Sequence, residues 1–178
     1  MEWKPSLISL VPVAAIAIPA VAHAKIYVGL EQAQQMIFPG QKLTQKPVFL
    51  SDEQRAKMQE QSSVREPFKG ERVWRTDRGE WFIVDEVVGK HEMVKYALGL
   101  NADGSIKQIE IMEYVESYGY EVGEVSWKQQ FYGKTSAATL KLNQDIKNIA
   151  GATLSCKHLT DGVKRLMVMY DLALKSAK

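Results

Sequence analysis

Apolar and polar residues alternate along the middle of the chain in a pattern that predicts antiparallel strands. Residues 93–100 and 106–114 are rich in β-branched and aromatic side chains, and the segment 101–104 between them reads Asn-Ala-Asp-Gly, a hairpin loop whose glycine suits a positive φ. Both alternating faces of the second stretch carry apolar side chains, which indicates a central strand. Together with residues 73–75 and 80–88, these stretches predict a small antiparallel sheet of three to four strands.

A helical period replaces the alternation near the C-terminus. From residue 154 or 157 to residue 174, apolar side chains recur at intervals that place them on one face of a long helix. The stripe consists of Leu159, Val163, Leu166, Met167, Tyr170, Ala173 and Leu174. We therefore expect an α+β fold in which the sheet packs against helices that include this long C-terminal helix.

Shorter helices are predicted from spacing and from their end signals. Residues 31–38 have helical spacing, Ser51 is placed to cap a polar helix, and Ser126 is placed to cap a short one. Residues 41–50 and most of residues 133–149 show neither period, so we expect them to form connectors.

The first 24 residues carry a different pattern, an apolar run at positions 7–21. Ala-His-Ala follows the run and puts small residues at the −3 and −1 positions of a cleavage site, which predicts a signal peptide over residues 1–24. An uncleaved anchor is the alternative, although the run is shorter than the ~20 residues that span a bilayer and two prolines interrupt it. Either interpretation places residues 25–178, one domain, outside the cytoplasmic membrane, in the periplasm.

Composition narrows the chemistry that this domain can perform. The 23 Lys and Arg residues nearly balance the 21 Asp and Glu residues, and no basic stripe occurs, so nothing favours nucleic acid as a partner. The single cysteine, Cys156, excludes an intramolecular disulfide and a cysteine-based metal site, and the three histidines show no metal-ligand spacing. Any chemistry that this domain performs must therefore come from a bound cofactor.

The clearest chemical signal is the segment 150–155, Ala-Gly-Ala-Thr-Leu-Ser, at the entrance to the C-terminal helix. A helix N-terminus offers free N–H groups and the positive end of a dipole, which together favour an anion. Gly151 and Ala152 leave no bulk in front of the backbone, and Thr153 and Ser155 supply hydroxyls, so a phosphate can be hydrogen-bonded or esterified here. A tight turn with Thr153 as a helix N-cap explains the same six residues.

With this segment, the chain resembles the FMN-binding domain family. That family includes the flavin-carrying periplasmic subunits of the Rnf complex and of the sodium-pumping NADH:quinone reductase, and small exported stand-alone relatives. The resemblance is strongest over residues 82–174. It extends through Gly-Lys-His-Glu at 89–92, Glu-Ser-Tyr-Gly at 116–119 and Phe-Tyr-Gly-Lys at 131–134.

The resemblance implies FMN as the cofactor and a way to retain it. In the family, a flavin transferase uses FAD to join FMN through its phosphate to the last residue of a Ser/Thr-Gly-Ala-Thr segment, and Thr153 is the matching residue. The chain departs from the family pattern at Ala150, where Ser or Thr is usual, and at Lys147, where Asp is usual. Cys156 also replaces a common Ser.

The same resemblance implies a set of cofactor-binding residues around Thr153. They are Gly151, Ala152, Thr153, Leu154, Ser155, Glu116, Tyr118, Gly119 and Trp127. Tyr118 would stack on the flavin ring, and its alternative role is that of a surface aromatic residue at a turn. Trp127 would flank the ring, and its alternative role is to anchor the short helix in the core. His158 would face the phosphate or solvent, and no metal site is expected.

The implied function is that of an exported electron carrier rather than a stand-alone enzyme. Its FMN would pass electrons from a membrane-bound donor to an acceptor, and a flavin transferase would attach the cofactor. Contact with the membrane would come only through a partner or an uncleaved N-terminus. Two alternatives stay open at this stage: a cofactor-free periplasmic binding module, and a flavin-dependent reductase with a small substrate of its own.

Overall fold

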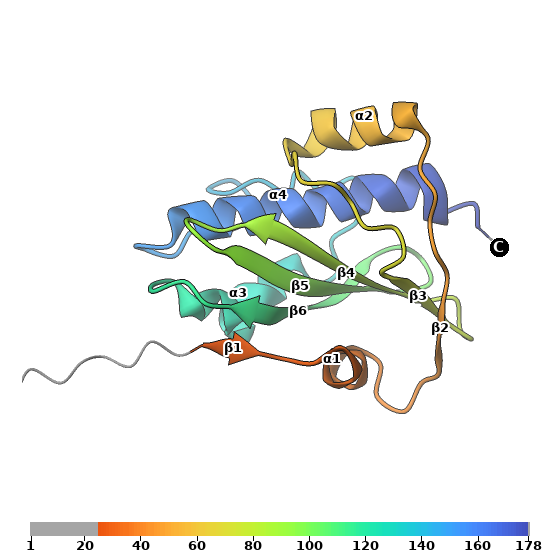
Figure 1. The fold of residues 1–178 in the computed structure, drawn as a ribbon, viewed down its shortest axis with the longest axis horizontal. Helices are drawn as coiled ribbons and strands as arrows, with labels where there is room; N and C mark the ends of the chain where they lie inside the picture. The colour runs from red at the N-terminus through yellow and green to blue at the C-terminus, as the bar shows by residue number, and fades with distance from the viewer. Residues whose placement is uncertain (1–24, 178) are drawn as a thin grey trace, which may run out of the picture.

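A six-stranded antiparallel sheet, with helices on both of its faces, forms the centre of the molecule in the computed structural model, which describes residues 25–177 (Figure 1). The strand order is β1-β6-β5-β4-β3-β2. The strands are β1 (Ile26–Tyr27), β2 (Leu43–Gln45), β3 (Val73–Thr76), β4 (Trp81–Val88), β5 (Met93–Leu100) and β6 (Ile106–Tyr114). The helices are α1 (Leu30–Ile37), α2 (Asp52–Ser62), η1 (Tyr120–Gly123), α3 (Val125–Lys128), η2 (Gln129–Phe131), α4 (Thr153–Met169) and η3 (Tyr170–Leu174).

The α+β class is confirmed, but the prediction of three to four strands is wrong. Strands β3 to β6 are the predicted meander, and the 101–104 hairpin turns at Gly104 with a φ of 85°. The additional strands, β1 and β2, are two and three residues long and lie at the two edges of the sheet. Strands this short have no alternation of their own, and β2 falls inside the predicted connector 41–50, so only pairing with β6 and β3 creates them.

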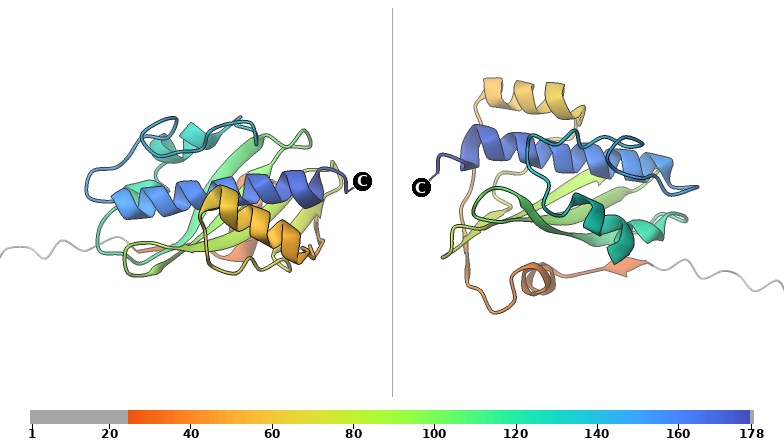
Figure 2. Two further views of the ribbon diagram at one scale, coloured as in Figure 1. Left: turned by 90° about the horizontal axis from the view of Figure 1, so that it is seen from above. Right: turned by 180° about the vertical axis from the view of Figure 1, so that it is seen from behind.

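The long helix α4 lies across one face of the sheet, α2 packs on its outer side, and α1 covers the opposite face (Figures 1 and 2). All the residues of the predicted apolar stripe belong to the core between α4 and the sheet or pack against it, so the stripe is confirmed. A smaller core lies under α1 and is built from Ala33, Ile37, Phe38, Phe82, Val84, Ala97 and Met112. Because both faces are covered, the central strands are apolar on both sides.

The two predicted helix caps have different outcomes. Ser51 caps α2 as predicted: its hydroxyl accepts the Gln54 N–H at 3.2 Å, and the Gln54 side chain accepts the Ser51 N–H at 2.9 Å. Ser126 is not a cap, because α3 begins one residue earlier and its N-cap is Glu124.

A buried ion pair fixes the position of α4 on the sheet. The Arg165 guanidinium, on α4, donates to both carboxylate oxygens of Asp85, on β4, at 2.7 and 2.6 Å. The Tyr96 hydroxyl, on β5, donates to the same carboxylate at 2.9 Å. These contacts cross from helix to sheet, so they also determine where the N-terminal end of α4 lies.

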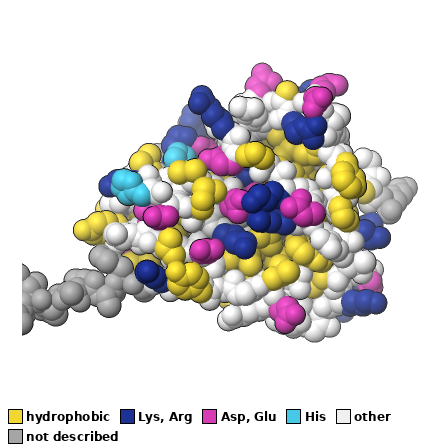
Figure 3. Space-filling view, in the orientation of Figure 1, with side chains coloured by type: hydrophobic (Ala, Val, Ile, Leu, Met, Phe, Trp, Pro, Cys, Tyr) yellow, Lys and Arg dark blue, Asp and Glu magenta, His cyan; other side chains and the backbone are white. Residues whose placement is uncertain are grey.

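Three further features concern the surface and the chain ends. On the face shown in Figure 3, cationic and anionic side chains are interspersed. No helix within residues 25–177 is both long enough and apolar enough to cross a membrane. The predicted signal peptide, residues 1–24, lies outside the described residues.

Candidate functional site

Three segments that are distant in sequence meet at the N-terminal end of α4 and line a cavity of about 310 Å³. They are the turn between β4 and β5, the loop after β6 and the turn that leads into α4. The lining residues are Lys90, His91, Glu116, Ser117, Tyr118, Gly151, Ala152, Thr153, Leu154 and Ser155. Seven of the nine predicted cofactor-binding residues are among them, and Gly119 and Trp127 are not.

The start of α4 is open to a ligand. The helix begins at Thr153, its N-cap is Ala152, and no side chain caps it. The first N–H of α4 that is bonded to a backbone carbonyl belongs to Cys156, at 2.9 Å from the Ala152 oxygen. The N–H groups of Thr153, Leu154 and Ser155 therefore have no acceptor within the described part of the chain. The alternative role of Thr153 as an N-cap is thus wrong.

Thr153 combines exposure with a fixed neighbour. Its side-chain hydroxyl accepts a hydrogen bond from the Asn148 amide at 2.8 Å, and the residue itself is exposed. Gly151, two residues earlier, has a φ of 84°, which favours glycine, and a Cβ at this position would meet no atom within 4 Å. A phosphate beside Thr153 would therefore find N–H groups and a hydroxyl, with no bulk in its way.

The loop after β6 packs directly on this turn. A Cβ at Gly119 would lie only 2.3 Å from the Cβ of Ala152, so glycine is required for the approach. The Tyr114 hydroxyl donates to the Tyr118 carbonyl at 2.6 Å and lies 3.2 Å from the Ser155 hydroxyl. The loop and the start of α4 are therefore held side by side.

Glu116 joins the same loop to the turn between β4 and β5. One carboxylate oxygen accepts the N–H groups of Lys90 at 2.5 Å, His91 at 2.6 Å and Glu92 at 3.0 Å. A Cβ at Gly89 would lie 2.5 Å from that oxygen, so this turn also needs glycine. Burial disfavours the charged carboxylate, but the three donors outweigh it and hold the pKa of Glu116 below its ordinary value.

The two predicted aromatic residues lie in different environments. Tyr118 is at the cavity and is 69% exposed, so it can meet a planar ligand. Trp127 is 4% exposed and packs edge-to-face on Phe131. Its indole N–H donates to the Lys147 carbonyl at 2.9 Å. The structure therefore places Trp127 in the core and not with the residues that line the cavity.

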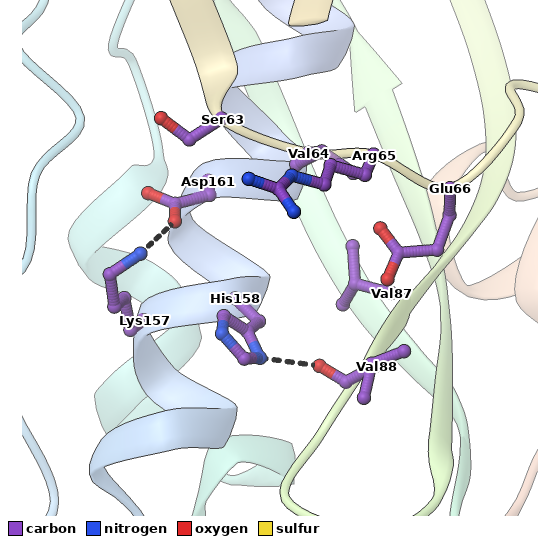
Figure 4. Close-up of a pocket in the computed structure, with 9 residues that line it drawn as sticks. All are labelled: Ser63, Val64, Arg65, Glu66, Val87, Val88, Lys157, His158 and Asp161. Atoms are coloured by element: carbon purple, nitrogen blue, oxygen red, sulfur yellow. Dashed lines mark hydrogen bonds and ion pairs between the residues drawn. The ribbon is translucent and has the colours of Figure 1, made fainter.

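His158 belongs to a neighbouring cavity of about 190 Å³, which Lys157, Asp161 and residues 63–66 also line (Figure 4). Its Nδ1 lies 2.7 Å from the Val88 carbonyl and 3.1 Å from the Gly89 carbonyl. Both neighbours are acceptors, so Nδ1 carries a proton. His158 thus anchors α4 to the end of β4.

Sequence reasoning missed several residues that shape the site. Asn148 and Tyr114 reach it through side-chain hydrogen bonds across the fold, and no linear motif reveals such contacts. Lys90 and His91 had a signal, since they belong to the Gly-Lys-His-Glu segment of the resemblance, but no cofactor role was assigned to them. Within residues 25–177, no group of three His, Cys, Asp or Glu side chains could hold a metal ion.

Comparison with known protein families gives a match in the second half of the chain. Residues 89–168 match the family described as the FMN-binding domain, and no curated protein matches the chain. The matched stretch contains all three segments that line the cavity. The residues present fit FMN: free N–H groups and a hydroxyl suit its phosphate, and an exposed aromatic side chain suits its ring.

Proposed function

Because residues 89–168 match the FMN-binding domain family, we propose that this protein is an exported electron carrier whose FMN is joined to Thr153 as a phosphoester. The family match supports FMN as the cofactor. The covalent attachment to Thr153 and the role as an electron carrier are what we propose. The observation that carries it is the exposed Thr153 hydroxyl at an uncapped helix start, at the edge of a cavity.

The residues of the cavity bind and orient the cofactor. When bound, FMN supplies redox chemistry in one- or two-electron steps. The N–H groups at the start of α4 favour the phosphate, but a helix dipole contributes only about 0.3–1 kcal/mol at an exposed site. That is too little to retain a cofactor outside the cell membrane, so a covalent bond serves retention.

Exposure of the site favours a carrier over an enzyme with its own substrate. Tyr118 and Leu154 line the cavity and are 69% and 46% exposed. A ring held beside them stays within reach of large partners, as exchange of electrons with a membrane-bound donor and a separate acceptor requires. Residues 1–24 support the periplasm as the compartment.

Attachment needs FAD and a flavin transferase. The Thr153 oxygen forms a bond to the phosphorus of the FMN half of FAD, the phosphorus–oxygen bond of the pyrophosphate bridge breaks, and AMP leaves. The hydroxyl proton passes to a base of the transferase or to water.

The test is the intact mass of the full chain produced together with an active flavin transferase. We expect an FMN adduct on the wild-type protein and on Thr139→Ala, an exposed threonine that serves as the matched control. Thr153→Ala should fold, because the side chain is exposed, and should lose the adduct and its fluorescence in a denaturing gel. A wild-type protein without the adduct would contradict covalent attachment, and failure to bind added FMN would contradict the assigned site.

A further inference from the structure

The segment before the site is anchored by the buried Trp127 and by the side chain of Gln130. The indole N–H of Trp127 donates to the Lys147 carbonyl at 2.9 Å, and the Lys147 N–H donates to the Gln130 side-chain oxygen at 2.8 Å. Trp127 is 4% exposed and contacts the buried Phe131, so the indole cannot move without opening the core. Both backbone groups of residue 147 are therefore held in place.

Asn148 is the next residue, and its neighbours on both sides are anchored. Ile146 is 1% exposed, and the Ile149 carbonyl accepts the Ala152 N–H at 3.1 Å. The side-chain amide of Asn148 then reaches over the turn and donates to the Thr153 hydroxyl oxygen at 2.8 Å. The chain of contacts runs from the core to the oxygen that would be esterified.

A threonine in a helix divides its side chain between two rotamers, because its hydroxyl can turn back to a carbonyl three or four residues earlier. Thr153 is the first residue of α4 and its side chain is exposed, so burial does not fix its rotamer. The Asn148 amide occupies a lone pair of the hydroxyl oxygen, which selects one rotamer and directs the hydroxyl's own proton elsewhere.

We propose that Asn148 is a positioning residue for flavin attachment, which holds the Thr153 hydroxyl in the orientation that the transferase uses. This inference rests on the proposed function. Residue 147, where the family usually has Asp, takes part through its backbone, which bonds to Trp127 and Gln130. The side chain that contacts the Thr153 hydroxyl belongs to residue 148.

The first test measures transfer of FMN from FAD to the full chain by a purified flavin transferase. For Asn148→Ala we expect kcat to fall about threefold to tenfold, the effect of one hydrogen bond, with KM for the protein substrate unchanged. Asn148→Gln keeps the amide and should recover part of the rate. Gln144→Ala removes an exposed amide from the same loop and should match the wild type.

The second test needs no transferase and no flavin. Three-bond couplings to the Thr153 methyl group report its χ1 rotamer, and we expect one rotamer in the wild type and averaging in Asn148→Ala. Averaging in the wild type, transfer to Asn148→Ala at the wild-type rate, or a loss that is confined to KM would overturn the inference. If the wild type shows one rotamer but accepts no FMN, the proposed function fails and the positioning contact stands.

Discussion

Glu116 lies where the loop after β6 meets the turn between β4 and β5. Its carboxylate accepts hydrogen bonds from three backbone N–H groups of that turn. The N–H groups of residues 90–92 converge on a single oxygen, so the turn between β4 and β5 is shaped by a charge that the loop after β6 supplies. Gly89 and Gly119 allow the close approaches on either side. At the residue scale, the cavity is therefore built by a carboxylate and two glycines.

The change Glu116→Gln tests this role and its pH dependence. Hydrogen bonds to a charged group contribute roughly 1.5–3 kcal/mol, so we expect a loss of about 1–3 kcal/mol in the free energy of unfolding at pH 7. Because the folded pKa of Glu116 is lowered, its contribution is complete above the unfolded pKa of about 4.3 and is lost as the pH falls through the folded pKa. Urea unfolding at several pH values should show the two proteins converging in acid. A constant difference down to pH 2 would contradict this assignment.

Helix α4 carries the site at one end and the main core along its length. Its Gly162 lies against the sheet, where a Cβ would sit 2.6 Å from the Tyr96 hydroxyl and 2.8 Å from a Val87 methyl group. Tyr96 cannot give way easily, because its hydroxyl is bonded to Asp85 in the core. At the element scale, one small residue thus sets how closely the helix approaches the strands.

The change Gly162→Ala sets two effects against each other. Alanine is favoured over glycine inside a helix by about 1 kcal/mol, but overpacking a core costs about 1–3 kcal/mol. The clash is with buried groups on both sides, so we expect net destabilisation, measured by chemical denaturation. Lys164→Ala, on the same helix, should stay within about 0.5 kcal/mol of the wild type. A stabilised Gly162→Ala protein would show that the helix can move away from the sheet.

The whole molecule is held together across its layers by the pair of Arg165 and Asp85. Arg165 is 2% exposed, and besides Asp85 its guanidinium contacts the carbonyl of Glu86 at 3.1 Å and that of Glu66. The pair thus links α4, β4 and the segment after α2. Because the N-terminal end of this helix lines the cavity, the shape of the cavity depends on a contact three helical turns away.

Removing one partner should cost more than removing both. Arg165→Met leaves the Asp85 carboxylate buried and unpaired, and we expect a loss of about 3–5 kcal/mol. The double change Arg165→Met and Asp85→Leu removes the stranded charge, so it should recover a large part of that loss. Thermal and urea unfolding of the two single variants and the double variant measure this coupling. Additive losses would show that the two side chains act independently.

Local sequence determined the elements whose own length shows a period. Strands β5 and β6 begin and end where alternation predicts, and the stripe of α4 is buried as its spacing requires. The turn at residues 150–155 could also be singled out as a candidate phosphate site, because its glycine and hydroxyl side chains are close together in the chain. These features depend on neighbours in sequence, and the sequence lists such neighbours directly.

Only the tertiary structure decided the contacts that join distant segments. Strands β1 and β2 exist through pairing with β6 and β3, and Trp127 lies in the core because its indole meets the Lys147 carbonyl there. The carboxylate of Glu116 and the amide of Asn148 find their partners only after the chain has closed. A hydrogen bond between segments depends on how whole elements pack, and no local period encodes that packing.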